Sequence, residues 1–81
     1  MVKIRIEVGY LESVEDPESS TLFHNLGILG YNDVENVRIL KTYEIDFSCD
    51  ENSAKEMAKA IAENLLINPV INSFRVIVLG E

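Results

Sequence analysis

The chain has 81 residues, of which 14 are acidic, seven are basic and one is histidine, so its formal net charge at neutral pH is −7. This length suits a single domain over residues 1–81 and leaves no room for a separate cofactor domain. Because so acidic a surface repels phosphate groups, we expect no nucleic-acid and no membrane partner. One cysteine excludes an intrachain disulfide, and the alternating N-terminus is unlike a signal peptide, so we predict a cytoplasmic protein.

The first two predicted elements are a strand and a helix. Residues 2–8 alternate strictly between apolar and charged side chains, which is the period of a half-buried strand. Asp16 and Pro17 mark a helix start, because the carboxylate accepts hydrogen bonds from free backbone donors and Pro has no N–H to leave unpaired. Gly30 is a typical helix stop. Helical spacing places four apolar side chains on one face: Leu22, Phe23, Leu26 and Leu29.

A second, longer strand is predicted over residues 37–47. Its odd-numbered positions are apolar except Lys41, so the adjacent residues Leu40 and Lys41 invert the alternation for one step. Such an inversion indicates a bend, a bulge or a contact with another chain. A two-residue turn between two short strands is the alternative, but neither residue is a turn former, so we favour one bent strand.

A second helix and a last strand complete the pattern. The helix is predicted to begin at residues 50–53, with Ser53 and Glu56 as a capping box, and to end before Asn68–Pro69. Residues 74–79 are largely apolar on both faces, as in a strand that is buried on both sides or covered by a partner. The apolar face predicted for the helix consists of Ala54, Met57, Ala58, Ile61 and Leu65.

The element order β-α-β-α-β predicts an α+β fold, a two-layer sandwich with a ferredoxin-like general shape. Both helices need an apolar surface to cover, so we expect a small, mainly antiparallel sheet that is covered on one face by the two helices. A three-stranded sheet has two edges with unpaired backbone groups, and pairing with a second copy would protect them. The order of the strands is not readable from the pattern.

Side chains that commonly carry chemistry are few and scattered. His24 is placed on the helix face opposite the apolar stripe, and Cys49 has no base on its own element. The acidic residues at 12–18 suit a helix start and lack the spacing of a calcium loop. The sequence contains no phosphate-binding loop, nucleophile elbow or metal-ligand spacing, so we expect no catalytic, cofactor-binding or metal-binding residue in this chain.

Three blocks of the sequence together resemble a known family. They are residues 11–17 (LESVEDP), residues 29–41 (LGY followed by VRILK) and residues 65–71 (LLINPVI). In order and spacing these blocks resemble the small subunit (PurS) of phosphoribosylformylglycinamidine synthase over nearly the whole chain. Two positions depart from the family's pattern, since Glu18–Ser19 stands where the family usually has Gln-Gly, and Leu40 stands where it usually has Gly.

The resemblance implies a role in de novo purine biosynthesis within a complex of three kinds of subunit. A large synthetase subunit, which uses ATP and Mg²⁺, would activate formylglycinamide ribonucleotide, and a glutaminase subunit would release ammonia from glutamine. The small subunit, as a dimer, would bridge the two and help ammonia to pass between them. It would carry no catalytic residue and bind no cofactor of its own. The unprotected sheet edges and the apolar last strand themselves predict a homodimer or a tetramer.

The residues expected at subunit contacts come from the second and third strands. Burial of Leu40 and Lys41 is favourable only if a partner covers the leucine and supplies an acceptor for the lysine. The alternative is a twisted strand end at which both side chains reach water. The last strand is apolar on both faces, so we also expect contact residues on that strand. The candidate subunit interface consists of Arg38, Leu40, Lys41, Tyr43, Phe74 and Val76.

Two other functions fit the same architecture. An ACT-like dimeric domain would bind a small effector, but the sequence has no Gly-rich ligand loop before its first helix. An acylphosphatase-like enzyme would need an Arg in a phosphate-binding loop, and no Arg lies between Glu7 and Val37.

Overall fold

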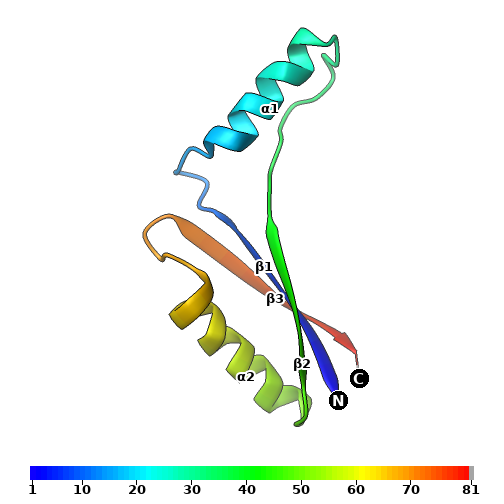
Figure 1. The fold of residues 1–81 in the computed structure, drawn as a ribbon, viewed down its shortest axis with the longest axis vertical. Helices are drawn as coiled ribbons and strands as arrows, with labels where there is room; N and C mark the ends of the chain where they lie inside the picture. The colour runs from blue at the N-terminus through cyan, green and yellow to red at the C-terminus, as the bar shows by residue number, and fades with distance from the viewer. Residues whose placement is uncertain (81) are drawn as a thin grey trace.

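The fold is a three-stranded antiparallel sheet with one helix packed on it and a second helix held away from it (Figure 1). The computed structural model describes residues 1–80. Strand order is β2-β1-β3, and both neighbouring pairs are antiparallel, which confirms the predicted β-α-β-α-β arrangement. The elements are β1 (Val2–Tyr10), α1 (Pro17–Ile28), β2 (Lys41–Phe47), α2 (Glu51–Ile61), a π-helical turn (Ala62–Leu66) and β3 (Asn72–Gly80).

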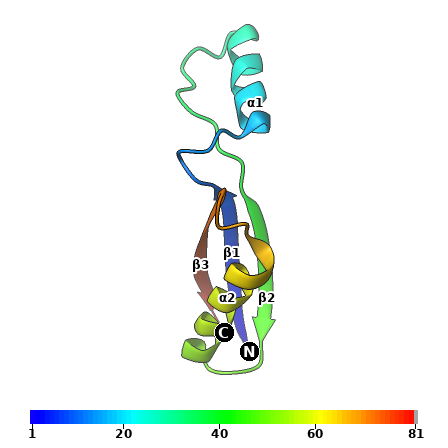
Figure 2. The same cartoon turned by 90° about the vertical axis from the view of Figure 1, so that its left-hand side faces the viewer.

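The hydrophobic core lies between α2 and the inner face of the sheet. Alternation turns every second side chain of β1 inward, so Ile4 and Ile6 are completely buried and Val2 is 1% exposed. Three alanines at four-residue spacing form the buried face of the helical segment, and their small side chains allow a close approach to the sheet: Ala54, Ala58 and Ala62. The helix lies over β1 and β3 (Figure 2).

The outer face of the sheet is charged. Arg5 on β1 forms an ion pair of 2.8 Å with Glu44 on β2, and Glu7 on β1 forms one of the same length with Arg75 on β3. These pairs join directly opposite residues of neighbouring strands. Two pairs of opposite charge are therefore matched across the strands of this face.

The first helix does not cover the sheet, so the prediction that two helices share one face of the sandwich is wrong for α1. The helix extends beyond one end of the sheet, and the molecule measures 49 × 27 × 13 Å. Its radius of gyration is 15.9 Å, whereas a compact chain of this length would have about 12 Å. The apolar stripe of a helix shows that something must cover it, but it does not specify which surface.

The second strand is shorter than predicted. Its ladder with β1 begins at the pair Val8–Lys41, and residues 34–40 continue from it toward the far end of α1 as an extended segment without strand pairing. The change of pattern at Leu40–Lys41 therefore marks the start of the strand rather than a bend within it. Lys41 lies on the inner face and Leu40 on the outer face, as the alternation predicts.

One glycine makes room for this extended segment. A Cβ atom at Gly9 would lie 2.6 Å from Cδ2 of Leu40 and 3.2 Å from Nη2 of Arg38, so both side chains rest against the bare backbone of β1. A larger residue at this position would force Leu40 and Arg38 to move.

An aspartate caps the start of each α-helix. Asp16 accepts a hydrogen bond of 3.0 Å from the backbone N–H of Glu18, as predicted. The second helix is capped by Asp50, which accepts from the backbone N–H of Ser53, so the predicted capping box with Ser53 as its first residue is wrong. Asp50 is the N-cap residue, and its carboxylate reaches the backbone N–H of Ser53, three residues later.

The end of α1 is as predicted, whereas the end of α2 is not. Gly30 has a φ of +96°, and the backbone N–H of Tyr31 bonds to the carbonyl of Leu26, which closes the helix in a Schellman motif. In the π-helical turn one extra residue shifts the following side chains, so Leu66 takes the inward position expected for Leu65. Leu65 is 78% exposed, and its assignment to the buried face is wrong.

Candidate functional site: an interaction surface

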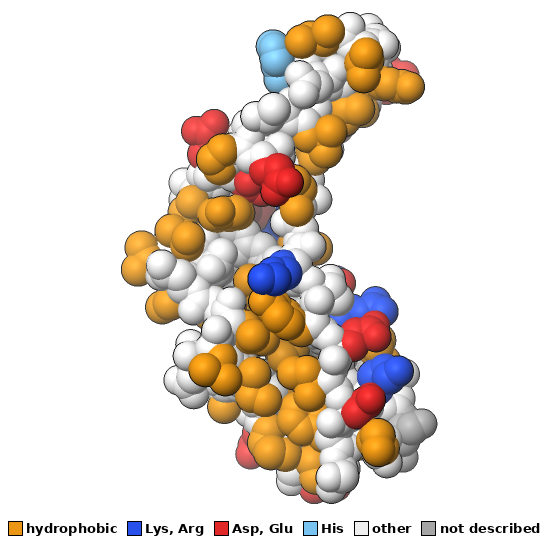
Figure 3. Space-filling view, viewed as in Figure 1, with side chains coloured by type: hydrophobic (Ala, Val, Ile, Leu, Met, Phe, Trp, Pro, Cys, Tyr) orange, Lys and Arg blue, Asp and Glu red, His pale blue; other side chains and the backbone are white. Residues whose placement is uncertain are grey.

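The most unusual surface of the molecule is the part that extends beyond the sheet. We call residues 11–40 the arm; it contains the loop after β1, helix α1 and the extended segment that returns to β2. Helix α1 has no substantial contact with any strand or with α2. Five large apolar residues of the arm are 43–73% exposed: Leu22, Phe23, Ile28, Leu29 and Tyr31. Several hydrophobic side chains of this region are visible in Figure 3.

The arm is also strongly acidic. It contains six of the 14 acidic residues and one of the seven basic residues, so it carries a net charge of −5 and the rest of the chain carries −2. A surface that is both apolar and acidic is complementary to an apolar surface with basic residues at its rim. The arm therefore has the composition of a contact surface with a defined kind of partner.

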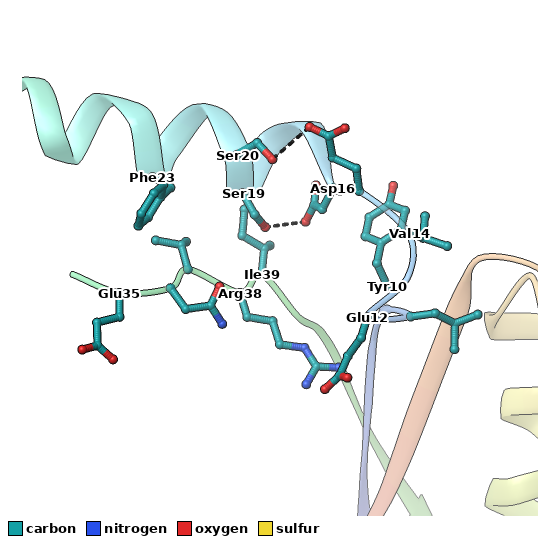
Figure 4. Close-up of a pocket in the computed structure, with 14 residues that line it drawn as sticks. Tyr10, Glu12, Val14, Asp16, Ser19, Ser20, Phe23, Glu35, Arg38 and Ile39 are labelled. Carbon is teal, nitrogen blue, oxygen red and sulfur yellow. Dashed lines mark hydrogen bonds between the residues drawn. The ribbon is translucent and has the colours of Figure 1, made fainter.

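A hollow of about 430 Å³ lies at the base of the arm, between the loop, the first turns of α1 and the returning segment (Figure 4). Two of its acidic side chains, Glu15 and Asp16, accept hydrogen bonds from residues in the first turn of α1. The hydroxyl of Ser19 donates to Asp16 over 2.5 Å, and that of Ser20 donates to Glu15 over 3.3 Å. The Ser19 hydrogen bond lowers the pKa of the Asp16 carboxyl below its ordinary value. These carboxylates thus hold the chain at the helix start.

A second unsatisfied surface lies on β2. We call the inner side chains Tyr43, Ile45 and Phe47 the β2 strip; α2 packs over the two other strands, and all three side chains stay half-buried. Hydrophobic side chains gather over this part of the molecule in Figure 3. At one end of the strip the ammonium group of Lys41 lies 5.4 Å from the centroid of the Tyr43 ring, a cation–π contact.

The six predicted interface residues lie in three places. Lys41 and Tyr43 are on the inner face of β2, and Phe74 and Val76 are on the inner face of β3. Lys41 and Phe74 are both opposite Val8, so the central strand separates the two pairs. Arg38 and Leu40 rest on Gly9 on the other side of the sheet, with Leu40 41% exposed. Their role in an interface stays a prediction.

The two isolated reactive side chains, His24 and Cys49, lie on the parts of the chain that the sequence predicts for them. His24 is exposed on α1, and Cys49 is a half-buried free thiol after β2. Among residues 1–80 no group of three or more His, Cys, Asp or Glu side chains is arranged to hold a metal ion. In the same part of the chain, no helix has the length and apolar character needed to cross a membrane.

Sequence reasoning missed the exposed apolar surface of the arm. It placed the apolar face of α1 on the chain's own sheet and selected interface residues only from the strands. One signal was available, because the arm contains no basic residue before Arg38. Asp16 caps the start of α1, and the other acidic residues give this part of the chain its charge of one sign.

Comparisons with known proteins identify the family. Residues 3–80 match the family model described as PurS, phosphoribosylformylglycinamidine (FGAM) synthase. The chain belongs to the PurS family. It is 36% identical over 75 residues to the FGAM synthase subunit PurS of Bacillus subtilis, a match that covers 93% of this chain and 89% of that one. It is 30% identical over 77 residues to PurS of Methanocaldococcus jannaschii, with 94% and 93% covered.

Solved PurS structures share the fold. The crystal structure of M. jannaschii PurS, described as one of the subunits of formylglycinamide ribonucleotide amidotransferase in the purine biosynthetic pathway, matches with a TM-score of 0.90 at 30% identity and covers 100% of this chain and 99% of that one. A chain in the structure of PurLQS from Thermotoga maritima matches with a TM-score of 0.85 at 29% identity, and 96% of each chain is covered. Membership of the PurS family confirms the resemblance seen in the sequence.

Proposed function

We propose that this chain is the non-catalytic small subunit of FGAM synthase, which bridges the ATP-dependent synthetase and the glutaminase and supports the transfer of ammonia between them. Family membership supports the assignment to the enzyme. The similarity to a chain of the T. maritima PurLQS structure supports its action inside a multisubunit complex. In this proposal ATP and Mg²⁺ are used by the large subunit, the small subunit binds no cofactor, and the complex is cytoplasmic.

The observation that carries the proposal is the excess of exposed surface. The chain exposes 5914 Å². A compact monomer of 9.1 kDa would expose about 4,900 Å². The excess of about 1,000 Å² is more than the roughly 800 Å² that one partner contributes to a standard protein interface. A chain with this shape is suited to contacts with other chains.

Within this function we propose that the chain acts as a homodimer. The sheet has two edge strands, and the backbone groups along them can pair with a second copy. The predicted contact residues on β2 and in the segment before it, Arg38, Leu40, Lys41 and Tyr43, lie along one of these edges. A symmetric dimer presents each remaining surface twice, so it can contact more than one neighbouring subunit.

The decisive experiment measures product formation by the synthetase and glutaminase with and without this chain. We expect glutamine-dependent synthesis to collapse when the chain is left out and to return when it is added back. Synthesis from ammonia supplied at high concentration should continue in both mixtures, because added ammonia does not need to be transferred.

Two results would contradict the proposal. Equal glutamine-dependent rates in both mixtures would show that the chain does not couple the two subunits. Loss of the ammonia-dependent rate as well would show that the chain contributes to the synthetase reaction itself or to the folding of that subunit.

A further inference from the structure

We propose that the segment between α2 and β3 docks into an apolar socket with basic side chains at its rim, on another subunit of the enzyme. We call residues 62–72 the junction; it contains the π-helical turn and the loop that leads into β3. This inference rests on the proposed bridging function and names the surface that makes one of its contacts. The partner is a folded subunit of a different kind and not a second copy of this chain.

The first argument is the exposure of two apolar side chains. Leu65 is 78% exposed and Val70 is 76% exposed, so both are more exposed than any large apolar side chain of the arm. The extra residue of the π-helical turn sends Leu66 to the core and leaves Leu65 facing outward. Hydrophobic side chains are visible along this border of the molecule in Figure 3. Such π-helical turns are rare and occur frequently at functional sites.

The second argument is that hydrogen bonds hold the loop of the junction in one conformation. The side-chain oxygen of Asn68 accepts from the backbone N–H of Val70 over 3.1 Å. The carbonyl of Asn68 accepts from the N–H groups of Ile71 and Asn72 over 3.0 and 2.8 Å. The side chain of Asn72 accepts from the N–H of Asn68 and donates to the carbonyl of Gly9 on β1. An ordered loop loses little conformational entropy on docking, so its exposed side chains are ready to bind.

The third argument is the charge around the junction. Residues 60–74 contain one acidic residue, Glu63, and no basic residue. The backbone N–H of Leu11 donates to the carbonyl of Ile71 over 2.9 Å, which brings the exposed Glu12 beside the loop. The ion pairs found among residues 1–80 include neither of these two glutamates. Free carboxylates beside apolar side chains are complementary to an apolar socket with basic groups around it.

The fourth argument separates this partner from a second copy. Strands β2 and β3 are the two edges of the sheet, and β1 lies between them. The proposed dimer pairs along the β2 edge, whereas the junction leads into β3. Two junctions in contact would bring carboxylates of the same sign together, which is unfavourable. In the proposed dimer the two junctions are therefore available to other subunits.

The test adds a positive charge at each apolar side chain of the junction. Leu65→Lys and Val70→Lys place an ammonium group against the basic rim of the socket, and Ala60→Lys is the control at an exposed position of α2. The readout is the concentration of this chain that gives half-maximal glutamine-dependent synthesis with the synthetase and the glutaminase. We expect both junction variants to raise it at least about tenfold, whereas the control should leave it unchanged.

Two further measurements make the result specific. Light scattering should find the same oligomer for all three variants, and circular dichroism checks that each is folded. The double variant Glu12→Gln with Glu63→Gln removes the two carboxylates that face the basic rim. In this variant the half-maximal concentration should rise less steeply with salt than it does for the unchanged chain, because fewer charges are left to screen.

Three outcomes overturn the inference. Folded junction variants that act at the same concentration as the control would show that the contact lies elsewhere. Dissociation of the dimer by a folded junction variant would show that the junction contacts a second copy. An unchanged salt dependence in the double variant would exclude the basic rim. If any of these occurs while glutamine-dependent synthesis still requires the chain, docking of the junction is wrong and the proposed bridging function stands.

Discussion

The sheet region buries large apolar side chains, whereas the arm exposes them. In the sheet region Ile4 and Ile6 are completely buried, because α2 lies directly over β1. In the arm Ile28 is 69% exposed and Leu29 is 73% exposed, although they belong to a well-capped helix. One region is a small domain with its own core, and the other exposes apolar side chains that no strand and no other helix of the described chain covers. The difference teaches that local helix signals and burial are set by separate causes in this chain.

The two regions also differ in how they hold their charges. The sheet region pairs them across strands, as in Arg5–Glu44 and Glu7–Arg75. The arm has six acidic residues and one basic residue, and Asp16 caps its helix. Charges of opposite sign that lie opposite one another are matched within the chain, whereas a surface with charges of one sign is complementary to a partner of opposite charge. This contrast leads to four further tests, beginning with the largest expected effect.

The strongest test of the contrast truncates one apolar side chain in each region. Ile4→Ala should lower the free energy of unfolding by about 2–4 kcal/mol, since it leaves a cavity under α2. Leu29→Ala should change it by less than about 0.5 kcal/mol, because the side chain is largely exposed in the single chain. Both are measured by urea denaturation at low protein concentration, where contacts between copies contribute least. Equal effects would show that the arm folds back onto the sheet.

A second test concerns the end of α2 within the sheet region. Leu66→Ala should cost about 1–2 kcal/mol, because this half-buried side chain packs against the core. Leu65→Ala should cost less than about 0.5 kcal/mol, because the π-helical turn points it outward. The same urea measurement applies. The opposite order of the two effects would indicate a regular α-helix through residue 66.

Two glycines of the arm should respond with opposite signs. Gly30→Ala places a side chain at a φ of +96°, which should cost about 1 kcal/mol. Gly27→Ala lies inside α1 with nothing within 4 Å of the added Cβ, and should stabilise the helix by about 0.5–1 kcal/mol. Helix content followed by circular dichroism during thermal unfolding measures both. A destabilising Gly27→Ala would reveal a close contact at that position.

The smallest expected effect separates the two regions by pH. The hydrogen bonds to Asp16 and Asp50 lower both carboxyl pKa values below the ordinary 3.8 in the folded chain. The unfolded chain therefore binds more protons, so each cap stabilises its helix above that pH and loses its contribution as the pH falls through the lowered pKa. Asp16→Asn should weaken the acid dependence of α1 alone, and Asp50→Asn that of α2 alone, as followed by NMR during acid titration. An unchanged α1 titration in Asp16→Asn would contradict this assignment.

The fold was predictable where each local signal had one interpretation. Alternation identified β1 and its two faces, and Asp16 and Gly30 gave the limits of α1 correctly. The prediction failed where the outcome depended on something outside the local pattern. The π-helical turn adds one residue to a turn without a sequence marker, so Leu65 and Leu66 exchanged roles.

The candidate site was predictable only in part, for a similar reason. The inverted pair Leu40–Lys41 marked a position at which the chain leaves its own sheet. The sequence does not encode whether the apolar face of α1 lies on its own sheet or on another chain, since both arrangements require the same residues. That choice depends on the length and direction of the segment at 34–40, which only the three-dimensional structure shows.

Residues 34–40 run back along α1 toward the sheet, and this constrains how the arm can change in length. A helix of 12 residues spans about 18 Å, and an extended chain covers that distance with about five or six residues. Two added helical residues therefore need one added extended residue, but a single extended residue would exchange the two faces of the part of the return path that lies beside α1. An insertion of about four residues in α1 with two in the return path preserves both the helix face and the strand face. Natural and engineered arms of different reach should therefore differ in steps of this size.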